Sequence, residues 1–93
     1  NILSTTQTPN IHYTIQISAW PTFEQARIDQ LKLIEEGFDV YIQRNYRQEK
    51  DAVWYRVRIG NFSDKIKAKI MQKQIESITG IKSWLDVIPK ENK

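Results

Sequence analysis

The chain has 93 residues, of which 40% are hydrophobic and 27% are charged, and its formal net charge is +3. This length and composition fit one folded domain with a single core and exclude a disordered polypeptide. The sequence has no cysteine, which excludes disulfides, thiolate metal sites and a thiol nucleophile. No run approaches the roughly 18 apolar residues of a membrane span. No signal-peptide pattern is present, so we expect any targeting segment of an exported parent protein to lie outside this sequence.

The two ends of the sequence are polar. Residues 1–10 contain Thr, Ser, Asn and Gln but no charged side chain, a composition typical of a linker. We therefore predict a polar linker over residues 1–11, one folded domain over residues 12–89 and a polar tail over residues 90–93.

The first half of the predicted domain has the pattern strand, helix, strand. Apolar and polar residues alternate from Tyr13 to Ser18, which predicts a half-buried strand. Thr22 and Gln25 have the spacing of a helix N-cap, and Gly37 is suited to end that helix. A second alternating strand is predicted over residues 38–43. The apolar side of the helix is expected to consist of Phe23, Ala26, Leu33 and Ile34.

The second half repeats this order. Residues 44–52 are polar and charged, and we predict a hairpin loop there, followed by a strand over residues 54–60. A second helix is expected to begin at Ser63 or Asp64 and to end near residue 80, before a last strand over residues 81–87. The expected apolar side of this helix is Ala68, Met71, Ile75 and Ile78. The expected inward residues of the last strand are Ile81, Leu85 and Val87.

The two halves also match each other residue by residue. At a spacing of 42 residues, Tyr13 falls on Tyr55 and Trp20 falls on Phe62. Two such halves predict an α+β fold of the ferredoxin-like (RNP-like) type, in which two βαβ units form a four-stranded antiparallel sheet with both helices packed on one face. The first and third strands are expected at the centre. We expect function on the other, uncovered face of the sheet.

Two strands resemble those of a known family. The segment Tyr13–Trp20 (YTIQISAW) resembles the first strand of SPOR domains, which usually has an aromatic residue, an apolar residue, a glutamine and a small pair before another aromatic residue. The segment Trp54–Phe62 (WYRVRIGNF) resembles that family's third strand and its turn. The resemblance covers about residues 12–88.

The resemblance implies a non-catalytic domain that binds peptidoglycan and prefers glycan strands without stem peptides, as amidases leave them during division or sporulation. It also implies that the binding groove is the uncovered face of the sheet. The family's small pair is often Gly-Ser, whereas this sequence has Ser18 and Ala19, so the hydroxyl is displaced by one residue. The positions implied as glycan-binding by the match are Gln16, Ser18, Arg56, Arg58 and Trp84.

The chemistry of these side chains suits a glycan. Tyr41 and Trp84 are expected to present aromatic faces at opposite edges of the sheet, and the amide of Gln16 both donates and accepts hydrogen bonds. Arg56 and Arg58 can bind a carboxylate through charge-assisted hydrogen bonds. Removal of the stem peptide leaves such a carboxylate on the lactyl group of muramic acid. We therefore expect one of these arginines to select stripped glycan.

Structural roles compete with these binding roles. Trp84 can instead be a core residue of an edge strand. Arg56 or Arg58 can pair with Asp39 or Asp86 across the sheet. Three further aromatic residues have other expected positions: Trp54 on either side of the sheet, and Trp20 and Phe62 in the core.

No constellation of residues indicates catalysis. The single histidine, His12, stands at the predicted linker boundary. No pair of acids flanks an evident cleft, as hydrolysis of a glycosidic bond requires, and the sequence has no glycine-rich phosphate loop. We therefore expect no enzymatic activity, no metal and no cofactor.

A single-stranded nucleic-acid-binding module is the main alternative, because RNA-recognition domains share this topology and bind bases on the same sheet face. Residues 44–73 hold nine basic and three acidic residues, so their net charge is nine minus three, or +6, which suits a polyanion. The third strand, however, lacks the aromatic-rich signature of those domains. A ferredoxin-like domain that binds a protein or a small regulatory ligand is a second alternative.

The sequence therefore predicts a monomeric SPOR-type domain of the cell envelope. It is expected to bind denuded glycan strands of peptidoglycan and to target its parent protein to the division septum. We expect no nucleic-acid partner, and membrane attachment only through other parts of the parent chain.

Overall fold

In the computed structural model of the protein, residues 11–89 are described, and they form four strands, two α-helices and one short 3-10 helix. The predicted linker up to Asn10 and the tail from residue 90 lie outside the described residues. Ile11, expected in the linker, is instead the first residue of a strand. The elements in chain order are β1 (Ile11–Trp20), α1 (Phe23–Glu35), β2 (Val40–Arg47), η1 (Gln48–Lys50), β3 (Ala52–Phe62), α2 (Lys65–Thr79) and β4 (Trp84–Pro89).

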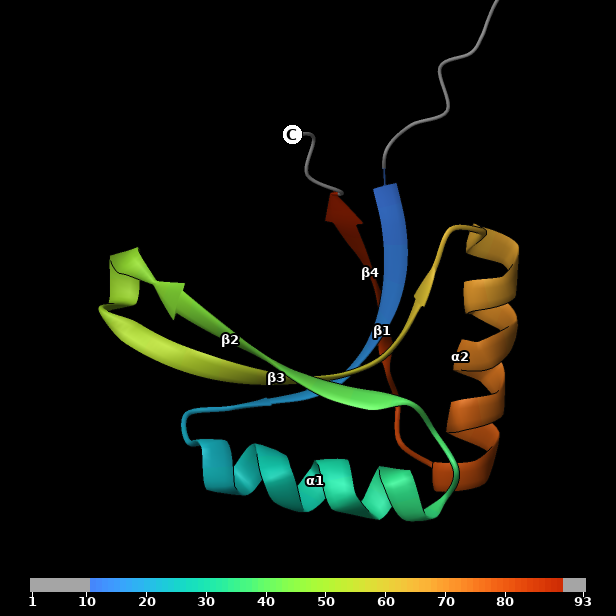
Figure 1. The fold of residues 1–93 in the computed structure, drawn as a ribbon, viewed down its shortest axis with the longest axis horizontal. Helices are drawn as coiled ribbons and strands as arrows, with labels where there is room; N and C mark the ends of the chain where they lie inside the picture. The colour runs from blue at the N-terminus through green and yellow to red at the C-terminus, as the bar shows by residue number, and fades with distance from the viewer. Residues whose placement is uncertain (1–10, 90–93) are drawn as a thin grey trace, which may run out of the picture.

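The four strands form one antiparallel sheet in the order β2-β3-β1-β4. Both helices pack on the same face, so the predicted ferredoxin-like fold, with β1 and β3 at the centre, is confirmed. The sheet is strongly curved, and the helices lie on its convex side (Figure 1). Within residues 11–89, no helix covers the concave face (Figure 1).

Both helices begin and end where the sequence predicts. The Thr22 hydroxyl accepts a hydrogen bond from the backbone N–H of Gln25 at 3.2 Å, and the Asp64 carboxylate accepts one from Ile66 N–H at 2.8 Å. These side-chain oxygens satisfy N–H groups that have no partner within the helix. Of the two starts proposed for the second helix, Asp64 is therefore the N-cap, and Gly80 ends that helix at a φ of +73°.

Two irregularities in the strand pairing bend the sheet. The register of β1 against β3 shifts between Tyr13 and Ile15 and again between Gln16 and Ser18. At the first shift, β3 carries the extra residue and Gly60 has a φ of +79°. A Cβ atom at this position would lie 2.3 Å from the ring of Phe62, so only glycine fits this β-bulge. Bulges of this kind increase local twist and curvature, in agreement with the concave face in Figure 1.

The core lies between the sheet and the two helices. Ile15, Ile17, Val57 and Ile59 of the central strands are buried, and the predicted core positions Trp20 and Phe62 pack against them. Burial of such aliphatic side chains contributes about 1.5–3 kcal/mol each. The buried helix residues are Ala26 and Leu33 on α1 and Ala68 and Ile75 on α2.

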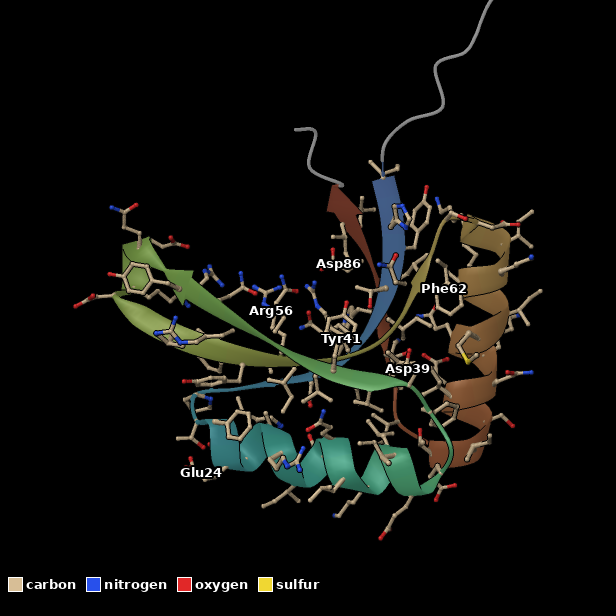
Figure 2. All side chains as sticks on the ribbon, in the orientation of Figure 1. Glu24, Asp39, Tyr41, Arg56, Phe62 and Asp86 are labelled. Atoms are coloured by element: carbon tan, nitrogen blue, oxygen red, sulfur yellow. The ribbon has the colours of Figure 1, made fainter. Side chains whose placement is uncertain are left out.

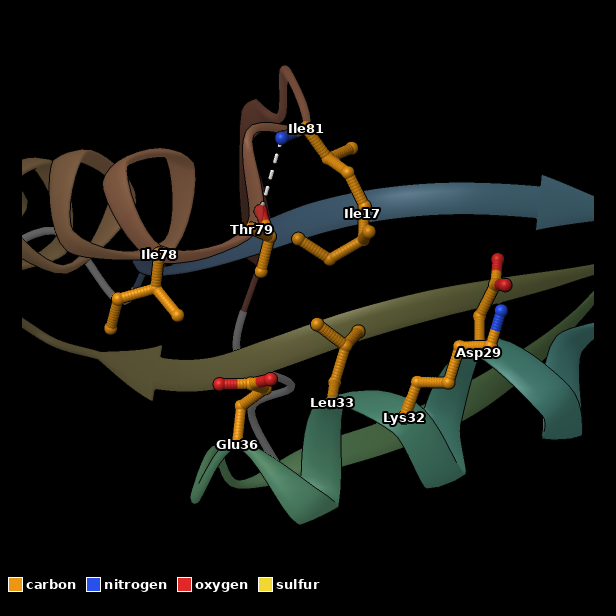
Figure 3. Close-up of a pocket in the computed structure, with 8 residues that line it drawn as sticks. All are labelled: Ile17, Asp29, Lys32, Leu33, Glu36, Ile78, Thr79 and Ile81. Atoms are coloured by element: carbon orange, nitrogen blue, oxygen red, sulfur yellow. Dashed lines mark hydrogen bonds between the residues drawn. The ribbon is translucent and has the colours of Figure 1, made fainter.

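Five residues predicted to face the core are instead exposed. Phe23, at the start of α1, contacts the ring of Tyr55 edge-on but remains exposed. Ile34 follows the buried Leu33 and points away from the sheet, because consecutive helix residues lie about 100° apart. Ile78, in the last turn of α2, and Ile81, which precedes β4, line a cleft of about 240 Å³ between the two helices (Figure 3). Val87 is on the edge strand β4 and also remains exposed.

The start of β4 is fixed by a carboxylate of α2. Glu76 accepts hydrogen bonds from the backbone N–H of Ser83 at 2.9 Å and from its hydroxyl at 3.0 Å. These bonds hold the pKa of the Glu76 carboxyl below its ordinary value of 4.5. The Gln72 amide donates to the Ser83 carbonyl at 3.1 Å. Together these contacts position the residue that immediately precedes Trp84.

The Glu76 contact predicts an acid-dependent loss of stability. A carboxylate with a lowered folded-state pKa stabilises the fold above its unfolded-state pKa, and this contribution is lost as the pH falls through the folded value. We expect the free energy of unfolding of the wild type to fall more steeply than that of Glu76→Gln below about pH 4.5. Urea unfolding from neutral pH to pH 3 measures this. As a control, Glu35→Gln should keep the wild-type slope, and parallel curves for wild type and Glu76→Gln would contradict the assignment.

Candidate functional site

Four of the predicted site residues form one row across the uncovered face. In the sheet register, Tyr41 on β2 is opposite Arg58 on β3, and Arg58 is opposite Gln16 on β1. Gln16 is in turn opposite Trp84 on β4. Because β2 and β4 are the edge strands, this cross-sheet row runs the full width of the sheet. Figure 2 shows Tyr41 and Asp86 on the concave side, away from the helices.

Arg58 is the buried centre of the cross-sheet row, with only 5% of its surface exposed. Its Nη1 donates to Gln43 Oε1 at 2.7 Å, and its Nη2 donates to Gln16 Oε1 at 3.0 Å. Nη2 also forms an ion pair with Asp86. These bonds hold the guanidinium within the sheet. They favour the alternative in which Arg58 pairs with Asp86 over its predicted contact with a ligand.

The contacts of Arg58 also orient two glutamine amides. Gln16 and Gln43 both use their side-chain oxygen as acceptor toward Arg58. The NH₂ group of each amide makes no hydrogen bond within residues 11–89 and therefore remains available as a donor. Both side chains are half-buried. The concave face thus carries two positioned amide donors, of which Gln43 was not predicted.

Arg56 differs from Arg58 in its contacts. It lies on the same face of β3, opposite Gln43 on β2 and Ala19 on β1, and projects to the concave side (Figure 2). Its Nη1 makes a single long contact of 3.5 Å with Gln16 Oε1. Its Nε is buried and has no partner in the described part of the chain. A ligand cannot reach this buried nitrogen. The Nη2 group also has no partner among residues 11–89 and is not buried, so it can donate a charge-assisted hydrogen bond to an anion.

Tyr41 reaches across the centre of the sheet. Its hydroxyl donates to Thr14 Oγ1 on β1 at 2.9 Å, and Thr14 Oγ1 donates to the carbonyl of Gly60 at 2.7 Å. The Tyr41 side chain therefore crosses β3 near Gly60, where no side chain obstructs it. The ring is half-buried and fixed at both ends, so it offers one aromatic face to the concave side.

Trp84 stands at the opposite edge and is 58% exposed. This exposure excludes the alternative in which Trp84 belongs to the core. An indole this exposed on a sheet face offers a large amphipathic surface to a ligand. The two aromatic residues of the cross-sheet row thus lie on opposite edge strands, as expected from the sequence.

The prediction that Ser18 lies on the uncovered face is wrong. The register shift between Gln16 and Ser18 places Ser18 opposite the core residue Val57, and Ala19 takes the position opposite Arg56. The bulge turns Ser18 toward the helices. Its hydroxyl donates to Asp29 Oδ2 of α1 at 2.7 Å. The uncovered face therefore carries a methyl group at this point instead of a hydroxyl.

The β2–β3 hairpin is longer than predicted and adds residues to the face. The sequence predicted a loop over residues 44–52, but β2 continues to Arg47 and β3 begins at Ala52. The charged residues of this segment thus lie in or beside paired strands. A hollow of about 260 Å³ opens on the hairpin and is lined by Gln16, Ala19, Arg47, Lys50, Trp54 and Arg56. We call it the hairpin hollow. Trp54, whose side was left open by the sequence, is therefore on the concave face.

The described residues offer neither a metal site nor a membrane-spanning helix. His12 Nδ1 and Asn61 Oδ1 lie 2.6 Å apart at the surface. Among residues 11–89, no three His, Cys, Asp or Glu side chains are grouped as metal ligands. None of the described helices is long and apolar enough to cross a membrane.

Comparison with known proteins identifies a family. The family model described as SPOR domain matches residues 9–85. The solution structure of the peptidoglycan binding domain of the B. subtilis cell wall lytic enzyme CwlC superimposes with a TM-score of 0.70 at 22% identity, covering 89% of this chain and 96% of that one. A putative exported protein from Burkholderia pseudomallei K96243 gives a TM-score of 0.71 at 17% identity, covering 83% of this chain but 16% of that one. No curated protein matches the sequence.

The contrast between the two arginines predicts different effects on stability. Arg58→Ala removes an ion pair and three hydrogen bonds and leaves Asp86 and two amides without their partner, so we expect a loss of about 2–4 kcal/mol. The matched variant Arg56→Ala should cost about 1 kcal/mol or less, because Arg56 makes one weak contact. Urea unfolding of both variants measures this difference. Equal losses would show that Arg58 has no special structural role.

Proposed function

The chain belongs to the SPOR domain family, and from the side chains of its concave face we propose that it binds glycan strands of peptidoglycan without cleaving them. The observation that carries this proposal is the cross-sheet row of Tyr41, Arg58, Gln16 and Trp84. A sugar presents a flat apolar face and a rim of hydroxyl and N-acetyl groups. The row offers aromatic faces at its ends and the oriented amide donor of Gln16 between them.

The CwlC domain is described as peptidoglycan binding and shares the fold of this chain. Its description supports the ligand class that we propose here. The concave shape of the face also suits a long polymer, because a strand can lie across the sheet and contact several side chains at once. Flat stacking surfaces combined with positioned donors give orientation as well as affinity.

We assign the preference for denuded strands to Arg56. In peptide-bearing glycan, the lactyl carboxyl group of muramic acid is an amide, and an amidase converts it to a free carboxylate. Arg56 has no carboxylate within ion-pair distance in the described part of the chain, and its accessible Nη2 group has no acceptor there. A carboxylate would form charge-assisted hydrogen bonds with it. Arg58 cannot take this role because it is buried and paired with Asp86.

A binding role without catalysis fits the acids of this face. A glycosidase uses a pair of carboxyl groups that flank the scissile bond, one of them in a desolvated pocket. Asp86 is instead held by Arg58, and Asp39 is exposed. We therefore propose a module that binds without catalysis and uses no metal or cofactor. We further propose that it acts as a monomer and localises its parent protein at septal peptidoglycan of the cell envelope. In this proposal, residues 1–10 and 90–93 connect the domain to the parent chain, and any membrane attachment lies elsewhere.

The distribution of charge disfavours the nucleic-acid alternative. The +6 segment is divided between the two sides of the molecule. Four of its lysines lie on or beside the exposed surface of α2, which packs on the convex side of the sheet. They are Lys65, Lys67, Lys69 and Lys73. They therefore add nothing to the concave face, where RNA-recognition domains of this topology bind bases.

Co-sedimentation with purified sacculi, before and after amidase removal of stem peptides, tests the proposal. We expect the wild-type domain to bind more tightly after stripping. Trp84→Ala should weaken binding to both preparations about tenfold, because it removes the exposed stacking surface. Arg56→Ala should bind peptide-bearing sacculi like the wild type but lose the gain on stripping, a change of about tenfold for one charge-assisted contact.

The control is Tyr46→Ala. Tyr46 is an exposed aromatic residue of the same hairpin, but it is opposite Val53 and lies on the other face of β2 from Tyr41. This variant should bind both preparations like the wild type. Absence of wild-type binding to either preparation, together with binding to single-stranded oligonucleotides, would replace the glycan proposal by the nucleic-acid alternative.

A further inference from the structure

The hairpin hollow lies at the outer end of the β2–β3 hairpin, beside the cross-sheet row. Gln16 and Arg56 line the hollow, so the hollow is continuous with the row. Its remaining lining residues come from the hairpin and from the end of β1. They are Ala19, Arg47, Lys50 and Trp54.

The hairpin hollow has an excess of positive charge. Three of its lining residues are cations: Arg47, Lys50 and Arg56. Glu49 neutralises Arg47 through an ion pair of 2.8 Å. No carboxylate within residues 11–89 is within ion-pair distance of Lys50 or Arg56. Two cations therefore line the hollow without an ion pair in the described part of the protein, which favours an anionic ligand group.

Trp54 adds an apolar surface to this charge. It lies on the same face of β3 as Arg56, because residues two apart on a strand share a face. Its indole is half-buried and lines the hollow. A small side chain at Ala19, brought to this face by the bulge in β1, leaves room above the sheet. An indole beside two cations is suited to bind a sugar ring that carries a carboxylate substituent.

The positions of the two tryptophans indicate how long a ligand must be to contact both. Trp84 is on β4, two strands away from β3, and Trp54 is four residues from Arg58 along β3. With strands about 4.8 Å apart and a rise of about 3.3 Å per residue, the two positions are about 16 Å apart. A β-1,4-linked disaccharide is shorter than this separation, whereas a glycan of several sugars can span it. A disaccharide is therefore too short to contact both indoles.

We propose that the hairpin hollow is a second glycan subsite, which binds a sugar with a carboxylate substituent. Trp54 stacks on the sugar ring, and Lys50 and Arg56 together bind the carboxylate. This inference rests on the proposed function and deepens it. The bound strand runs obliquely from Trp84 to Trp54, and the muramic residue that Arg56 selects lies in the hollow.

Isothermal titration calorimetry with denuded oligosaccharides of two and of six sugars tests this subsite. The wild type should bind the longer ligand about tenfold more tightly than the shorter one, since only the longer one reaches both indoles. Trp54→Ala and Lys50→Gln should each lose most of this gain. Lys50→Gln should also weaken the dependence of affinity on salt concentration. Tyr46→Ala and Lys67→Gln, which are outside the concave face, should keep the full gain.

The outcomes separate the subsite from the proposed function. If the wild type shows the gain with length and both hollow variants lose it, the subsite is supported. If the wild type binds and Trp84→Ala weakens binding, but Trp54→Ala keeps the gain with length, the subsite is refuted while glycan binding stands. Equal affinity of the wild type for both lengths refutes it as well. No binding of either ligand to the wild type refutes the proposed function itself. Thermal unfolding of each variant verifies that it is folded.

Discussion

The concave face depends on one buried guanidinium. Arg58 on β3 contacts Gln43 on β2, Gln16 on β1 and Asp86 on β4, so a single side chain connects all four strands. A buried arginine is costly unless its donors are satisfied, and here acceptors on the three other strands of the sheet satisfy it. The result is a polar network on the side of the sheet that no described helix covers. Its outer atoms are amide donors, which remain available to a ligand.

This network divides the work between two neighbouring arginines. The guanidinium of Arg58 is bonded to three side chains of the protein and fixes their positions. Arg56, two residues earlier on the same strand, makes only one long contact. The aromatic residues complete the face: Tyr41 is fixed by its hydroxyl through Thr14, and Trp84 is held in place by the Glu76–Ser83 contact at the start of β4. The sheet and these contacts thus position the two aromatic residues of the row and the glutamine amides, which lowers the entropic cost of binding.

The fold was predictable because the strand patterns, the helix caps and the internal repeat all indicated the same arrangement of elements. Alternating strands, the caps at Thr22 and Asp64 and the 42-residue repeat all pointed to the same sheet, and the cross-sheet row followed from strand alternation. Ser18 was misplaced because a bulge breaks that alternation without a marker such as glycine in β1. The contrast between Arg56 and Arg58 could not be predicted either, because both side chains alternate outward and only the register of β4 brings Asp86 to one of them. The hairpin hollow was missed because charged residues near a turn favoured a loop over paired strands.

The most direct test of the account is the NMR spectrum of the ¹⁵N-labelled domain during titration with denuded glycan. The side-chain amides of Gln16 and Gln43 and the indole N–H groups of Trp84 and Trp54 report on the concave face, whereas the indole of Trp20, bonded to Asp29, reports on the helix side. We predict shifts of the first four signals and of the Arg56 side chain, with the Trp20 signal unchanged. Shifts confined to the helices, or no shifts at saturating glycan, would contradict the central claim that this sheet face is the glycan-binding surface.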